Sequence, residues 1–184
     1  MKEKDEQRKQ QRRLALAKLL IPICLFCAVW LIIALCGPET FGNFVIVFAT
    51  YTTAPVHNVS FAVSNGLSSG INPIALLAFL VFGDAVFALF FVWNFDYAKE
   101  IVVIRDVVEK AEKALKKHRW LVGLEFLGIT IFVMIPILPS APMGAILGRL
   151  MGIKPLLTFL AVILGSFTRF AIFAILYMYL FSML

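Results

Sequence analysis

The feature that most constrains this chain is an apolar segment interrupted by prolines, GITIFVMIPILPSAPMGAILGRLMG at residues 128–152. Pro136, Pro139 and Pro142 follow one another at three-residue intervals, with Ser140 among them and Gly144 shortly after. Proline inside a helix removes a backbone hydrogen bond and clashes with the carbonyl four residues earlier. Backbone opened at membrane depth survives only where protein or a cavity surrounds it, so we expect a re-entrant hairpin with a non-helical tip. The alternative is two helices joined by an ordinary loop at the membrane surface.

The composition places the chain in a membrane. Of its 184 residues, 61% are hydrophobic and only 15% are charged, against about 25% in typical soluble proteins. The mean hydropathy is +0.93. We therefore expect an all-α integral membrane protein, with a polar tail at residues 1–13 and one membrane domain at residues 14–184.

Three apolar runs are long enough to span a bilayer, which takes about 20 helical residues. They cover residues 14–36, 72–95 and 156–184. Between them we expect a first hairpin at 41–71, an amphipathic surface helix at 96–119, and a second hairpin at 120–153. Polar residues and a proline interrupt the first hairpin and form its tip, which includes Thr52, Thr53, Pro55, His57 and Asn58.

The distribution of charge predicts the topology. Residues 1–18 and residues 96–119 each hold seven Lys and Arg, whereas residues 37–71 hold none. The positive-inside rule puts both basic segments in the cytoplasm, so an odd number of crossings must connect them. The first hairpin is therefore expected to enter from outside and the second from inside. The C-terminus is then outside, or inside if the last run breaks at Gly165 and Ser166.

Two charges fall near the bilayer midplane. At 1.5 Å per residue, Asp84 lies roughly 18 Å into its run and Arg169 roughly 20 Å into the last one. An isolated Arg at a helix centre costs about 2.5–3.5 kcal/mol on insertion scales, so we expect the two to pair or to share a water-filled site. They either couple protons or substrate to transport, or form a fixed ion pair that holds the bundle together.

Other candidate site residues lie nearer the surfaces. His57 suits proton handling, although a hydrogen bond to nearby backbone explains it as well. Glu125 and Arg149 are expected near the cytosolic mouth, where Arg149 would meet anionic headgroups. Cys24, Cys27 and Cys36 fit as small apolar residues of the first membrane run.

Signatures of soluble enzymes are missing from the sequence. It contains no zinc-protease helix motif, phosphate-binding loop, dinucleotide fingerprint or nucleophile elbow. We therefore expect no catalytic residues, no metal and no cofactor. The basic residues follow membrane topology rather than a nucleic-acid-binding stripe.

Short motifs resemble the DedA/VTT superfamily, and within it the small multidrug export branch. They are Gly83-Asp84, the Glu-Lys-Ala-Glu of residues 109–112, and Ile135-Pro136 followed by Pro139, Gly144 and Gly148. Val133 and Pro139 stand where the DedA hairpin carries arginines. The resemblance implies two facing re-entrant hairpins and movement of lipids or lipid-linked carriers, in some members coupled to protons.

These features predict a transporter, or a scramblase- or flippase-like protein, in the cell membrane with its N-terminus in the cytoplasm. Its substrate would be a lipid, a lipid-linked carrier or another amphiphile. The path would lie between the tips at residues 52–57 and 136–142. Expected partners are membrane lipids and the substrate, with a homo-oligomer left open. The alternatives are a small multidrug exporter and a non-transporting scaffold or assembly factor.

Overall fold

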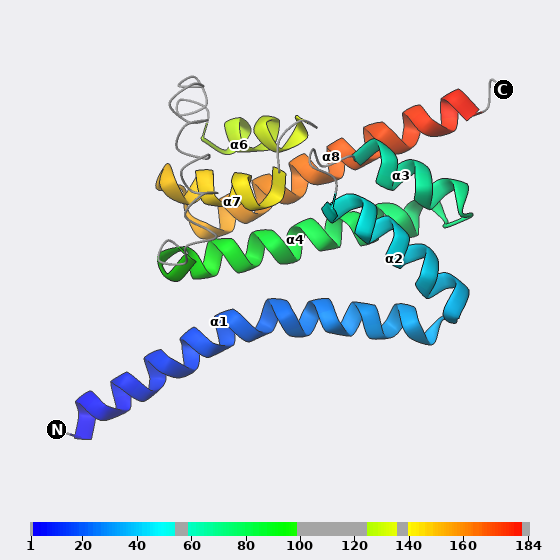
Figure 1. Ribbon diagram of the computed structural model, residues 1–184. Coiled ribbons are helices and arrows are strands. Elements are labelled where there is room, and N and C mark those ends of the chain that lie inside the picture. The colour runs from blue at the N-terminus through cyan, green and yellow to red at the C-terminus, as the bar shows by residue number, and fades with distance from the viewer. Residues whose placement is uncertain (1, 54–58, 99–124, 136–139, 182–184) are drawn as a thin grey trace.

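A computed structural model describes residues 2–53, 59–98, 125–135 and 140–181 of the chain. All the regular structure in these residues is helical, so the predicted all-α class is confirmed. The helices, shown in Figure 1, are α1 (Lys2–Leu35), α2 (Pro38–Thr53), α3 (Val59–Ser68), α4 (Pro73–Ala98), α6 (Glu125–Met134), α7 (Ser140–Leu150) and α8 (Pro155–Phe181).

Three of the described helices are long and apolar enough to cross a membrane. The qualifying parts are Arg13–Leu35 of α1, Pro73–Phe95 of α4 and Pro155–Leu180 of α8. They coincide with the three predicted spans. Since α8 is continuous through Gly165 and Ser166, the break that would have returned the C-terminus to the other side does not occur.

Helices α4 and α8 form the centre of the bundle. They run antiparallel and side by side along most of their length (Figure 1). One apolar core cluster joins the second half of α4 to α6, α7 and the start of α8. A second joins the first half of α4 to α2, α3 and the later part of α8. The two pairs of short helices therefore pack at opposite ends of the α4–α8 pair.

The four shorter helices form two pairs of chain neighbours, α2 with α3 and α6 with α7. With 10 to 16 residues each, α2, α3, α6 and α7 fall short of the ~20 residues of a full span. In Figure 1 each pair runs from one end of the bundle toward its middle and back. The expected tip residues Pro55, His57, Asn58, Pro136 and Pro139 lie outside the described residues, as does most of the predicted surface helix at 96–119.

One detail of the second hairpin was predicted wrongly. We expected the non-helical tip to extend through Pro142, but α7 already begins at Ser140 and includes Pro142 in its first turn. Proline is tolerated there because the amide it lacks has no helical partner in any case. Pro142 is therefore part of a helix, while Pro136 and Pro139 lie outside the described residues.

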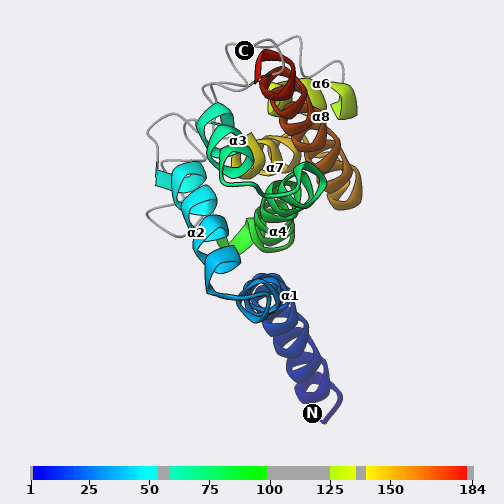
Figure 2. The same ribbon diagram turned by 90° about the vertical axis from the view of Figure 1, so that its right-hand side faces the viewer.

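Helix α1 stands at the edge of the bundle, packed mainly on α4 and set apart from α7 and α8 (Figure 2). It includes the polar tail in one helix with the apolar run and contains Pro22. Pro22 has no amide hydrogen for the carbonyl of Lys18, four residues earlier. Asn94 of α4, at a non-helical point in that helix, donates its side-chain amide to this carbonyl at 3.1 Å. The interaction ties α1 to α4.

Candidate functional site

The centre of the bundle holds a buried ion pair between the two long helices. Asp84 lies in the middle of α4 and is 0% exposed, and Arg169 lies in the middle of α8 and is 1% exposed. The Nη2 atom of Arg169 is 2.8 Å from Oδ2 of Asp84. The expectation that these two charges pair is confirmed.

Two hydroxyl groups complete the cluster. Tyr51, in the last turn of α2, donates its hydroxyl to Oδ1 of Asp84 at 2.5 Å. Ser166 of α8 donates to Oδ2 at 2.5 Å. Arg169 also donates from Nη2 to the Tyr51 hydroxyl at 3.2 Å. Both carboxylate oxygens of Asp84 are therefore hydrogen-bonded, and α2, α4 and α8 are joined through one set of polar atoms, which we call the Asp84 cluster.

Aromatic packing closes one side of the Asp84 cluster. The ring of Phe170 lies 4.7 Å from the guanidinium carbon of Arg169 and 5.7 Å from the ring of Tyr51. Phe170 is itself 0% exposed. A charge pair excluded from water in this way is held by strong interactions in a low-dielectric setting, but it carries a large desolvation cost. In this conformation the described residues bury both charged side chains almost completely.

Comparison with protein families identifies the kind of membrane protein to which this cluster belongs. The sequence model of the family described as "Putative small multi-drug export protein" matches residues 58–172, well over half of the chain. The chain belongs to this family. It matches none of the curated proteins or solved structures with which it was compared.

The family match covers most of the Asp84 cluster. It extends from α3 through most of α8 and includes Asp84, Ser166 and Arg169. Tyr51, on α2, lies before its first residue. Helix α1 and all of α2 therefore lie before the matched segment.

The described tip residues of the first hairpin are not part of the Asp84 cluster. Thr52 donates its hydroxyl to the carbonyl of Phe48 at 2.8 Å, and Thr53 donates to that of Ala49 at 2.6 Å. Both side chains are exposed and are satisfied by their own helix. Tyr51, next to them, is the residue that reaches Asp84.

The candidates of the second hairpin lie elsewhere in the bundle. Arg149, in the last turn of α7, has its guanidinium carbon 5.6 Å from the ring centroid of Phe95. Phe95 is eleven residues beyond Asp84, or about 16 Å along α4. Glu125 and Ser140 are the first residues of α6 and α7, and Pro142 is partly buried.

Gly144 has a packing role. It is buried in α7, where an added Cβ would collide with Cγ2 of Val133 on α6. The absence of a side chain therefore lets the two helices of the second hairpin approach closely. No interaction with the Asp84 cluster is needed to explain this glycine.

Sequence reasoning missed Tyr51 and Ser166 as site residues. Ser166 lies three residues before Arg169, a spacing that puts both side chains on one face of a helix. That relationship was available from the sequence. The contact of Tyr51 with Asp84 depends on how α2 packs against α4. Its only sequence signal was its place within the polar interruption at residues 50–58.

Proposed function

We propose that this protein is a transporter that moves an amphiphile across the cell membrane, with the Asp84 cluster as the polar core of its path. The observation that carries the proposal is the buried pair of Asp84 and Arg169, bridged by Tyr51. Ionisable residues inside membrane segments are rare because they are costly, and they mark substrate or ion pathways. Here they lie between the two pairs of short helices.

The helix arrangement supports re-entrant hairpins. Helices α2 and α3 pack at one end of the α4–α8 pair, and α6 and α7 pack at the other. Broken helices that meet near the midplane are typical of transport sites. With the basic tail and residues 96–119 in the cytoplasm, the second hairpin enters from inside and the first from outside.

The substrate class follows from two considerations. The resemblance to the DedA/VTT superfamily favours lipids or lipid-linked carriers, and the family description favours drugs. The substrate class that we propose is therefore an amphiphile that reaches the protein from the bilayer. Asp84 would couple its movement to protons, since acidic residues inside membrane segments form proton relays in pumps and transporters. We propose no enzymatic step, metal or cofactor for this activity.

A different class of function is a scaffold or assembly factor. The sealed state of the ion pair supports it, because a fixed pair needs no access to substrate. In that case the polar groups hold the bundle together, and the protein acts through partners that bind its surface.

Reconstitution separates these functions. The purified chain is placed in liposomes that contain a fluorescent phospholipid or, in a second set, a lipophilic dye. Movement of the fluorescent reporter across the bilayer is followed by its accessibility to an impermeant quencher, with and without a pH gradient. Movement faster than in empty vesicles, in either set, supports transport and identifies the substrate class. Rates equal to those of empty vesicles in both sets contradict it.

A further inference from the structure

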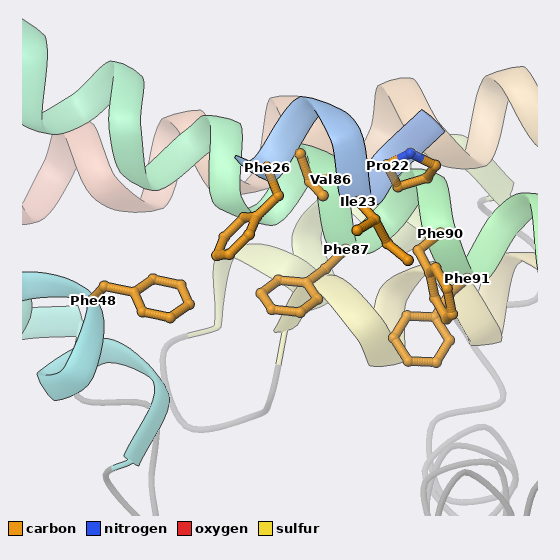
Figure 3. Close-up of a pocket in the computed structure, with 8 residues that line it drawn as sticks. All are labelled: Pro22, Ile23, Phe26, Phe48, Val86, Phe87, Phe90 and Phe91. Carbon is orange, nitrogen blue, oxygen red and sulfur yellow. The ribbon is translucent and has the colours of Figure 1, made fainter. Parts of the chain in front are cut away.

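A pocket of about 390 Å³ lies where α1, α2 and α4 meet. Five of its eight lining residues are phenylalanines, and the rest are Pro22, Ile23 and Val86. Figure 3 shows the rings of Phe26, Phe48 and Phe87 turned toward one another from the three helices. Phe26 and Phe48 have their ring centroids 5.5 Å apart. We call this the phenylalanine pocket.

The lining and the depth of the pocket define what it can hold. All eight side chains are apolar, so a charged or strongly polar group would lose its hydration there without a partner. On α4 the lining begins at Val86, thirteen residues after the helix starts at Pro73, which is about 20 Å along the axis. Only apolar molecules, or apolar parts of molecules, are abundant at that depth in a bilayer.

The aromatic walls favour one kind of apolar group. Phenylalanine rings pack against other rings in edge-to-face and offset arrangements that gain energy beyond the area buried, whereas an alkyl chain gains only the area. The volume lies at the small end of the range of about 300–1,000 Å³ found for small-molecule sites. A ring system of modest size therefore fits the pocket better than a lipid tail.

The phenylalanine pocket adjoins the Asp84 cluster. On α2, Phe48 is three residues before Tyr51, and on α4, Phe87 is three residues after Asp84. Residues three apart on a helix are neighbours on its surface. Because Tyr51 and Asp84 are hydrogen-bonded to each other, the pocket lies within about one turn of the cluster on both helices.

We infer that the phenylalanine pocket binds the aromatic part of a small amphiphile, whose polar part faces the Asp84 cluster. The inference rests on the proposed transport function and specifies its substrate class. Two of the lining residues, Phe26 and Phe48, lie on helices before the segment that matches the family model. The exposed side of α1, where Ile23 is 47% exposed, leaves the pocket accessible from the lipid.

Photolabelling tests the inference on the full chain in phosphatidylcholine nanodiscs. One arm uses an iodophenyl diazirine, and the other uses phosphatidylcholine with a diazirine on its acyl chain. Labelled residues are identified by mass spectrometry. We expect the phenyl probe to label residues 86–91 in a saturable way, and excess naphthalene to reduce that labelling about tenfold. The acyl probe should label the outer face of α8 instead.

Two variants provide a matched comparison. Val86→Phe fills the pocket and should reduce phenyl labelling of α4 about tenfold, whereas Ile172→Phe adds the same ring on exposed α8 and should not. If Val86→Phe fails to fold, competition by naphthalene on the unmodified chain decides. Labelling that rises linearly without competition, or equal labelling of residues 86–91 by the acyl probe, overturns the inference.

The failure of this inference differs from failure of the transport proposal. Transport without saturable labelling would reject the pocket and leave transport intact. Saturable labelling without transport in liposomes would leave an aromatic binding site in a protein that does not transport.

Discussion

Asp84 and Arg169 are 85 residues apart in the chain and 2.8 Å apart in the structure, where both are sealed from solvent. Each would be an isolated charge in an apolar setting without the other. Their pairing fixes how α4 and α8 are positioned along each other, because a shift of one turn would separate them by about 5 Å. The ion pair therefore sets the register of the two central helices.

Removal of one charge should destabilise the bundle far more than removal of both. We expect Arg169→Leu to lower the free energy of unfolding by about 3–5 kcal/mol, since it leaves Asp84 buried without its cation. The double variant Asp84→Leu with Arg169→Leu should recover much of this loss. Unfolding of purified protein in detergent measures both. Additive losses in the double variant would contradict coupling between the two residues.

The hydroxyl groups of the Asp84 cluster should contribute separately. Tyr51→Phe and Ser166→Ala each remove a hydrogen bond to a carboxylate and should each cost about 1.5–3 kcal/mol. Ser68→Ala is the matched control, because Ser68 is exposed and its hydroxyl donates to the carbonyl of Asn65 in its own helix. Its effect should stay within about 0.5 kcal/mol. Equal effects for Ser166 and Ser68 would show that the buried bonds are unimportant.

Close packing of α6 on α8 requires Gly165. An added Cβ there would lie 2.7 Å from the carbonyl oxygen of Thr130 and 2.8 Å from Cβ of Val133. Gly165→Ala should therefore destabilise the protein by about 1–3 kcal/mol. Gly42 of α2 has open space around it, so Gly42→Ala should stabilise by about 0.5–1 kcal/mol. Thermal unfolding compares the two, and a tolerated Gly165→Ala would contradict the packing described.

The contact between Asn94 and Lys18 should depend on Pro22. Asn94→Ala removes the donor to the Lys18 carbonyl and should cost about 1–3 kcal/mol. In a Pro22→Ala background the new amide of residue 22 can bond to that carbonyl, so the same substitution should cost less. A double-mutant cycle of unfolding free energies measures the difference. An unchanged cost in both backgrounds would mean that Asn94 acts independently of the proline.

The spans and the central pair could be predicted from sequence for physical reasons. Apolar runs of membrane length have few alternatives, and two midplane charges must find partners there. The hydroxyl of Tyr51 could not be assigned, because hydroxyls are common and its contact with Asp84 depends on tertiary packing. Pro142 was placed wrongly because proline has two roles. It breaks a helix when it lies in the interior, but it is tolerated in the first turn of a helix.

The phenylalanine pocket was also beyond sequence reasoning. Its lining comes from three helices, and each phenylalanine alone fits an ordinary lipid-facing position. Only the packing of α1 and α2 on α4 gathers Phe26, Phe48 and Phe87 around one space. The apolar pattern of the sequence predicts which segments are membrane helices. It does not predict which helix faces leave a pocket when the helices pack together.

The transport rate of the Asp84→Asn variant in liposomes tests the central claim most directly. The substitution removes the charge while it keeps the shape of the side chain, and folding is checked by gel filtration and helical content before rates are compared. Ser68→Ala, reconstituted at the same density, serves as the control. We expect folded Asp84→Asn to move the reporter amphiphile at least about tenfold more slowly than the unmodified chain. Folded Asp84→Asn protein that transports at the unmodified rate would contradict the account.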